Sequence, residues 1–171
     1  MRSWSVIIIL AVSQFVMVLD STVMNVSISV VADDLGTSIT GMQAAITFYA
    51  LTMAAFMLTG GKLGDLMGRA RAFKIGAVIY GIGSLTTALS PNLTVLLIGW
   101  SLVEGLGAVL VIPAIASLAA INYTGKARVT AFSILGAVTG LAAAVGPLLG
   151  GVMTTYLSWR YVFVAETVVM V

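Results

Sequence analysis

Long apolar runs separated by short polar breaks constrain the fold of this sequence more than any other feature. They predict six helices, over residues 6–31, 43–60, 75–90, 93–120, 129–153 and 160–171. A helix needs roughly 20 mainly apolar residues to cross a bilayer, and the last run is too short to do so. The sequence therefore predicts an all-α, polytopic membrane helix bundle with five full spans and a truncated sixth.

The composition agrees with a membrane location and excludes several other classes. Hydrophobic residues make up 60% of the chain, charged residues only 8%, and the mean hydropathy is +1.14, whereas soluble domains carry about 25% charged residues. We therefore expect a multi-pass protein of the cytoplasmic (inner) membrane, with the lipid bilayer as its partner. A net charge of +2 without a basic patch argues against nucleic acid. The absence of cysteine and histidine excludes disulfides, thiolate or imidazole metal sites and imidazole chemistry. We expect no metal, no cofactor and no catalytic residues.

The first apolar run is interpreted as a retained span and not as a signal peptide. It continues to about Val31 and no small-x-small cleavage site follows it. Lys and Arg then set the orientation. A cytoplasmic N-terminus places only Arg160 in an outer segment. The acidic pair Asp33 and Asp34 then lies in the first outer loop. The other seven basic residues are then inside, namely Arg2, Lys62, Arg69, Arg71, Lys74, Lys126 and Arg128.

Two acidic residues are predicted near the midplane of the membrane. Asp20 lies roughly 18 Å along its helix from the cytoplasmic start, and Glu104 roughly 15 Å from the outer start of its own helix. A carboxylate at that depth costs at least ~2.5 kcal/mol, so it should face a cavity, a partner or a bound proton. Asp20 is either a proton-exchanging group or a structural hydrogen bond between helices, and we favour the first. Glu104 is open to both interpretations. Glu166, predicted nearer the outer face, favours the structural one.

A helical wheel favours an aqueous cavity beside Asp20. On one arc lie polar residues and methionines, namely Ser13, Gln14, Met17, Ser21, Met24, Asn25 and Ser27. On the opposite arc lie the residues expected to contact lipid, namely Phe15, Val16, Leu19, Val23, Val26 and Val30. Polar groups mixed with methionine suit a cavity that accepts varied apolar shapes.

A glycine-rich charged segment joins the second and third runs. We expect its three glycines, Gly61, Gly64 and Gly68, to permit a sharp reversal, and Asp65 to cap the helix that begins near residue 70. Arg69 and Arg71 can pair with Asp65 or with helix ends when the cytoplasmic side is closed, which predicts a conformational switch. A static basic loop that only fixes topology is the alternative.

Small residues form a stripe on the fifth predicted helix. Its members are Gly136, Gly140, Ala143, Pro147, Gly150 and Gly151, while Gly146 departs from the line. Such a face allows another helix to approach closely, and Pro147 favours a kink. We expect this face to need a partner, either a missing C-terminal half or a second copy.

These segments resemble the motifs of one transporter family. Gly61-x-Leu63-x-Asp65-x-x-Gly68-Arg69 resembles the loop signature of the major facilitator superfamily. Residues 19–26 look like the first-helix motif of its fourteen-span drug:proton antiporters, and residues 140–151 are similar to their fifth-helix antiporter motif. Ser158-Trp159-Arg160 resembles the start of their sixth helix.

The resemblance implies a fold and an activity. Residues 1–171 would be the N-terminal six-helix half of a proton-coupled efflux transporter, moving drug-like or other amphipathic molecules by alternating access. Asp20, Asn25 and Glu104 would take part in coupling. The fourth-helix motif of the family usually has arginine where this chain has Ser101, and glutamine is common where it has Glu104, so the family's proton relay need not apply unchanged. The alternatives are a non-transporting fragment that serves as a membrane assembly or interaction partner, and a metabolite uptake carrier. The fifth-helix motif argues against the carrier by analogy.

Overall fold

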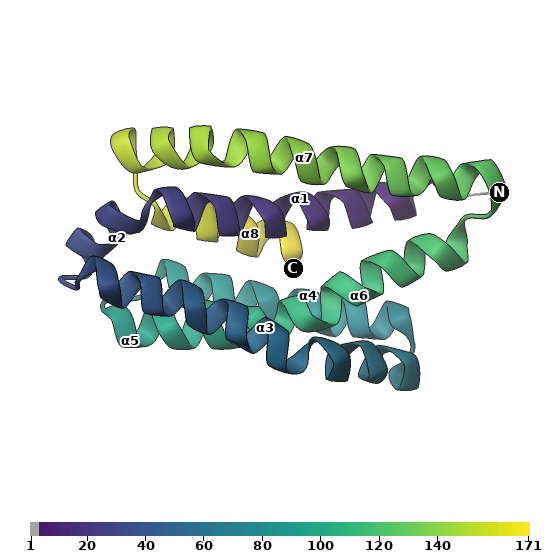
Figure 1. Cartoon of the computed structure of the whole chain (residues 1–171), viewed down its shortest axis with the longest axis horizontal. Coiled ribbons are helices and arrows are strands. Elements are labelled where there is room, and N and C mark those ends of the chain that lie inside the picture. The colour runs from purple at the N-terminus through teal and green to yellow at the C-terminus, as the bar shows by residue number, and fades with distance from the viewer. Residues whose placement is uncertain (1–3) are drawn as a thin grey trace.

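Helices make up nearly all of the part of the chain that the computed structural model describes, residues 4–171 (Figure 1). They are α1 (Trp4–Val26), α2 (Ile28–Asp34), α3 (Ile39–Met67), α4 (Arg69–Ala88), α5 (Leu93–Leu96), η1 (Leu97–Glu104), α6 (Gly105–Asn122), α7 (Gly125–Tyr156) and α8 (Arg160–Met170). No strand occurs within residues 4–171. The predicted all-α class is confirmed.

Four helical stretches are long and apolar enough to cross a membrane. They are Trp4–Val26, Ile39–Met67, Leu93–Asn122 and Gly125–Tyr156, and the third of these joins α5, η1 and α6. The 20-residue α4 and the 11-residue α8 are not among them. The membrane location is therefore supported, while the count of six spans and their orientation stay predictions. Arg2, which was counted among the inner charges, lies outside the described residues.

The connection between α3 and α4 is shorter than predicted. α3 continues through Gly61 and Gly64 to Met67, and only Gly68, with a φ of 92°, separates it from α4. The expectation that Gly61 and Gly64 form the reversal is wrong, because both lie inside a helix. A glycine inside a helix costs only about 1 kcal/mol relative to alanine, so these two positions do not end α3, whereas the positive φ of Gly68 cannot continue a right-handed helix.

The helices pack in two groups. α1 packs mainly on α7, while α4 packs on α6, η1 and α8, and α3 packs on α6. Figure 1 shows α7 along α1, with α3, α4 and α6 beside one another. Two glycines, which have no side chain, allow α4 to approach η1 and α6 closely. A Cβ on Gly83 would lie 2.5 Å from the backbone nitrogen of Glu104, and one on Gly107 would lie 2.5 Å from that of Tyr80.

A single arginine joins three helix ends on one side of the bundle. The Nη1 of Arg160 donates to the carbonyl oxygens of Ala88, at 3.0 Å, and Ser90, at 2.6 Å. Its Nη2 donates to Oδ2 of Asp34 at 2.7 Å, and the indole N–H of Trp159 donates to the same oxygen at 3.1 Å. The ends of α2 and α4 are thereby fixed to the start of α8.

The small-residue stripe on α7 is divided between two environments. Gly146 and Gly150 are buried against α1, and a Cβ on Gly150 would lie 3.3 Å from Cα of Val23. The expectation that Gly146 alone departs from the stripe is therefore wrong, since Gly150 faces the same way. Gly151 is half-buried with open space around it. The exposed members are Gly136, Gly140, Ala143 and Pro147.

Candidate functional site

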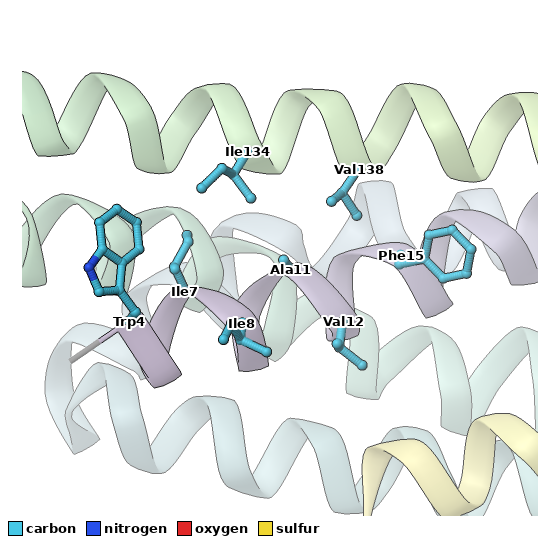
Figure 2. Close-up of a pocket in the computed structure, with 8 residues that line it drawn as sticks. All are labelled: Trp4, Ile7, Ile8, Ala11, Val12, Phe15, Ile134 and Val138. Carbon is cyan, nitrogen blue, oxygen red and sulfur yellow. The ribbon is translucent and has the colours of Figure 1, made fainter.

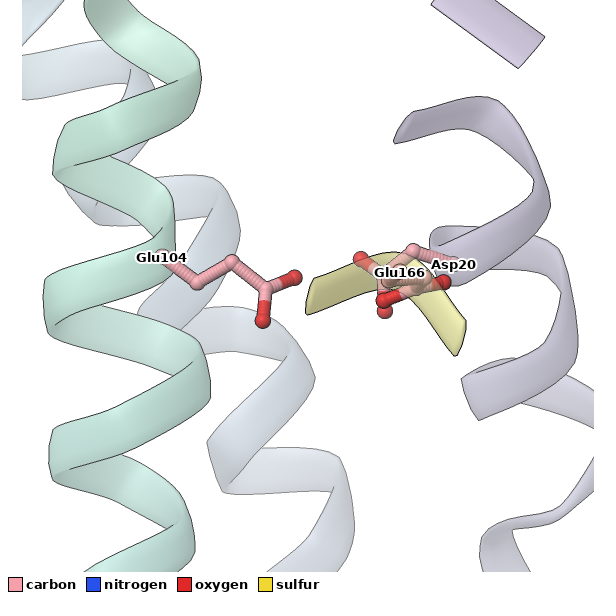
Figure 3. A group of neighbouring side chains, drawn as sticks. All are labelled: Asp20, Glu104 and Glu166. Carbon is pink, nitrogen blue, oxygen red and sulfur yellow. The ribbon is translucent and has the colours of Figure 1, made fainter. Parts of the chain in front are cut away.

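Three carboxyl groups from distant parts of the chain meet inside the bundle. Asp20 comes from α1, Glu104 from the end of η1 and Glu166 from α8, and one oxygen of each lies within 4.8 Å of the others. Their exposed fractions are 0%, 0% and 2%. Figure 3 shows the three side chains pointing toward one another. Glu166 was expected to be shallower, nearer the outer face than the other two acids, but its carboxyl group lies beside theirs.

Asp20 is held by a tryptophan on the neighbouring helix. The indole N–H of Trp100 lies 3.0 Å from Oδ1 and 3.1 Å from Oδ2 of Asp20. The ring of Trp100 is stacked on Tyr49, with centroids 4.8 Å apart. An indole nitrogen only donates, so Asp20 accepts this bond.

The surroundings of Asp20 differ from the predicted aqueous cavity. Asp20, Met17 and Met24 point into the packed interior of the bundle. Val16 and Val23, expected to contact lipid, are also buried. The wheel separated a polar arc from an apolar one, but α1 packs along α7, which covers part of the apolar arc and leaves Val26 and Val30 exposed.

Glu104 and Glu166 compete for one hydroxyl group. The Ser84 hydroxyl, on α4, lies 2.8 Å from Oε2 of Glu104 and 3.3 Å from Oε2 of Glu166. It has a single hydrogen to donate. Within residues 4–171, Oε1 of Glu104 and Oε1 of Glu166 have no hydrogen-bond partner.

No basic side chain balances the three acids. The described residues contain two ion pairs, Arg69 with Asp65 and Arg160 with Asp34, and neither involves the cluster. Buried charges are stable only when they are paired, and adjacent carboxylates disfavour each other's ionised form. The cluster must therefore be neutralised by protons or by a bound cation.

The helix that carries Glu104 changes its geometry at the site. Residues Leu97–Glu104 form a π-helical segment, a rare conformation that is frequent at functional sites. The segment places both Trp100 and Glu104 in the interior. Ser101, which stands where the resembled motif has arginine, donates its hydroxyl to the carbonyl of Ala45 at 2.8 Å.

Asn25, predicted to share in coupling, lies away from these contacts. It is exposed, and its amide donates to the carbonyl of Ser21 on the same helix at 2.7 Å. The structure therefore brings together Asp20 and Glu104 but gives Asn25 no hydrogen bond to the cluster.

The predicted switch segment is organised around one arginine. Arg69 pairs with Asp65, and its Nη1 donates to the carbonyl of Gly61 at 3.0 Å. Asp65 thus lies inside α3 and does not cap α4, which corrects the sequence expectation. Arg71 is exposed. A switching role for this segment stays a prediction.

An apolar pocket of about 360 Å³ lies between α1 and α7 (Figure 2). It is lined by Trp4, Ile7, Ile8, Ala11, Val12, Phe15, Ile134 and Val138. A second cavity, of about 320 Å³, shares Val12 and Phe15 with it and reaches Glu166. Apart from Glu166, both linings are apolar and suit hydrocarbon.

Sequence reasoning missed two residues of the site. Trp100 carries a signal, since a tryptophan in the middle of an apolar run needs an acceptor for its indole N–H. The candidates for this acceptor were the acidic residues predicted at a similar depth, Asp20 and Glu104. Ser84 carries no such signal, because serine is common in membrane helices and its partner depends on how α4 is rotated.

The sequence is similar to one protein family and to several known proteins. The sequence profile of the Major Facilitator Superfamily matches residues 10–171. The chain is 39% identical over 161 residues to the puromycin resistance protein pur8 of Streptomyces alboniger, covering 94% of this chain and 32% of pur8. It is 34% identical over 160 residues to the methylenomycin A resistance protein of Bacillus subtilis (strain 168), covering 93% of this chain and 34% of that protein.

The fold also matches a solved structure. The crystal structure of the peptide transporter POT in complex with sulfate aligns with a TM-score of 0.83 and 21% sequence identity, covering 96% of this chain and 35% of POT. At that identity the likeness concerns the fold alone. The chain spans about a third of the length of the curated relatives it matches.

Proposed function

Since this chain belongs to the major facilitator superfamily, we propose that it is the N-terminal half of a secondary transporter that exports drug-like molecules in exchange for protons. Membership confirms the family predicted from the sequence and places the chain among transporters, not enzymes. The direction of transport, the class of cargo and the coupling to protons are what we propose beyond family membership.

The names of the relatives support the cargo class. Two relatives more than 30% identical to this chain are resistance proteins, for puromycin and for methylenomycin A. A membrane transporter can confer resistance by exporting the toxic molecule. We therefore propose amphipathic, antibiotic-like molecules as the cargo, in preference to a metabolite taken up by the same fold.

The buried carboxyl cluster is the single observation that supports proton coupling. Asp20, Glu104 and Glu166 lie together without a basic partner among the described residues. A carboxyl group in such a place carries a proton while it is sealed from water and can release it when water reaches it. Asp20 is the proposed proton carrier, with Glu104 as its neighbour.

A second half is the proposed partner. Alternating access in this class of transporter is the rocking of one half against the other around a site near the midplane. The exposed small residues of α7, Gly136, Gly140, Ala143 and Pro147, offer a face for close helix contact. We propose that this face meets the second half in the cytoplasmic membrane.

A chimeric transporter tests this proposal. Residues 1–171 replace the matching segment of the puromycin resistance protein, and puromycin efflux is measured in vesicles with an imposed proton gradient. We expect gradient-dependent efflux that Asp20→Asn abolishes. The exposed acid Asp33 provides the matched control, so Asp33→Asn should leave efflux unchanged.

Two results would contradict the proposal. Efflux that persists in Asp20→Asn would remove Asp20 from the coupling mechanism. A chimera that inserts normally but exports nothing, with or without a gradient, would favour the non-transporting alternative.

A further inference from the structure

The indole N–H of Trp100 is shared between the two oxygens of Asp20, at 3.0 Å from Oδ1 and 3.1 Å from Oδ2. We propose that Trp100 is a positioning residue for proton exchange, which sets the pH range over which Asp20 takes up and releases its proton. The inference rests on the proposed function only in the choice of Asp20 as the proton carrier, and it adds a residue that the sequence did not indicate for this role.

The shared bond matches a carboxylate better than a carboxylic acid. The two oxygens of a carboxylate are equivalent acceptors, so one donor can lie between them at nearly equal distances. In the protonated form one oxygen carries the hydrogen, and the indole, which only donates, keeps a single acceptor. A hydrogen bond that is stronger to the charged form favours that form. Trp100 therefore eases the release of the proton from Asp20.

The position of the indole is fixed by contacts with α3. The ring of Trp100 is 1% exposed and is stacked on Tyr49, with centroids 4.8 Å apart and an angle of 11° between the planes. The next residue, Ser101, donates its hydroxyl to the carbonyl of Ala45 at 2.8 Å, one helical turn before Tyr49. Two neighbouring turns of α3 thus hold the π-helical segment. A rotamer change that turned the N–H away from Asp20 would also break the stack.

The other groups that act on Asp20 remain when the indole is changed. The titratable groups that face it are Glu104 on η1, Glu166 on α8, Tyr80 on α4 and Tyr49 on α3. The other neighbours of α1 contribute none at this depth. α6 has no ionisable residue, and those of α2 and α7 lie at the ends of these helices. A change in the titration of Asp20 on removal of the indole N–H is therefore assigned to that donor.

Infrared titration of the complete chain in detergent micelles tests the inference. The band of the protonated Asp20 carboxyl group is obtained by subtracting the spectrum of the same chain with Asp20→Asn, and its intensity is followed against pH. Trp100→Phe keeps an aromatic ring on Tyr49 but removes the N–H. We expect it to raise the midpoint of this titration by about one pH unit, or roughly tenfold in proton affinity. In the chimeric transporter, the pH profile of puromycin efflux should move in the same direction.

Trp159→Phe is the matched control. Trp159 is 2% exposed, and its indole N–H also donates to a carboxyl group, Oδ2 of Asp34 at 3.1 Å, away from the cluster. Both substitutions remove a buried indole bond, but only Trp100→Phe should shift the titration of Asp20. A purely structural role for Trp100 would lower efflux in both variants without moving the pH profile.

The inference is overturned if Asp20 titrates with the same midpoint in Trp100→Phe and in the unmodified chain, or if Trp159→Phe shifts the midpoint equally. An Asp20 band that is absent at every pH contradicts the proton-carrier proposal as well, whereas an Asp20 band that is insensitive to the indole contradicts this inference alone. Should Trp100→Phe fail to elute as a folded monomer, Trp4→Phe combined with Trp159→Phe leaves Trp100 as the single tryptophan. Emission that follows the Asp20 band then supports the inference, and emission that does not follow it contradicts the inference.

Discussion

Replacing Gly83 with alanine tests whether the close contact between α4 and η1 holds the carboxyl cluster in place. A Cβ at this position would lie 2.5 Å from the backbone nitrogen of Glu104 and 2.7 Å from its Cα. An ordinary van der Waals contact of a Cβ is at least 3.4 Å. Because both obstructing atoms belong to the backbone, no rotamer change relieves the clash. The two helices must separate by about 0.7–0.9 Å, the shortfall from 3.4 Å.

That separation also lengthens the adjacent hydrogen bond. The Ser84 hydroxyl and Oε2 of Glu104 are 2.8 Å apart, and an added 0.7 Å or so takes them beyond the usual range of an O–H···O bond. Overpacking costs about 1–3 kcal/mol, and the lost bond adds about 1 kcal/mol. The higher helix propensity of alanine offsets at most ~1 kcal/mol of this loss in unfolding free energy. We expect Gly83→Ala to lower the free energy of unfolding by about 1–3 kcal/mol.

The measurement is unfolding of the chain in detergent micelles, followed by tryptophan fluorescence. Gly61→Ala is the matched control, because Gly61 also lies inside a helix but has open space where the methyl group would go. We expect the control to unfold within about 1 kcal/mol of the unmodified chain, on the stabilising side. If Gly83→Ala is as stable as Gly61→Ala, the argument from backbone contact is refuted.

Two further substitutions probe the polar contacts. Trp100→Phe keeps an aromatic ring on Tyr49 but removes the N–H donated to Asp20, so we expect a loss of about 1.5–3 kcal/mol in unfolding free energy in detergent; an unchanged value would mean that the bond contributes little. Arg160→Gln removes a guanidinium that joins three helix ends, and we expect a loss of about 1–2 kcal/mol, measured as a lower midpoint of thermal unfolding. Arg71→Gln, at an exposed position, should leave that midpoint unchanged, and equal shifts in both variants would argue against the role of Arg160.

The helical architecture could be predicted because it depends on local properties of the sequence. Apolar runs predict helices wherever a bilayer forbids unpaired backbone groups. The error between the second and third runs has a different cause. Gly61 and Gly64 weaken a helix by only about 1 kcal/mol each relative to alanine, so α3 continues past them, and of the three glycines only Gly68 adopts a positive φ.

The candidate site could be predicted only in part, because it depends on how helices are rotated against each other. Asp20 and Glu104 were identified from their depth, which follows from position along a helix. Their distance from Glu166 follows from the packing of three helices, which no single-helix pattern contains. Glu166 was undervalued because its short apolar run suggested a shallow position. The wheel for α1 also ignored α7, which covers part of the arc assigned to lipid.

The π-helical segment Leu97–Glu104 limits which insertions and deletions this protein can tolerate. Removing one residue between Trp100 and Glu104 would let the segment close into ordinary α-helix. The two side chains would stay on one face of the helix, but each would point in a new direction, and the 3.0 Å bond from Trp100 to Asp20 depends on that direction. The number of residues between Leu97 and Glu104 is thus under stronger constraint than the identity of most of them. Exchanging Ile98 or Leu102, both exposed on the outside of the bundle, should disturb the protein far less than shortening the segment by one.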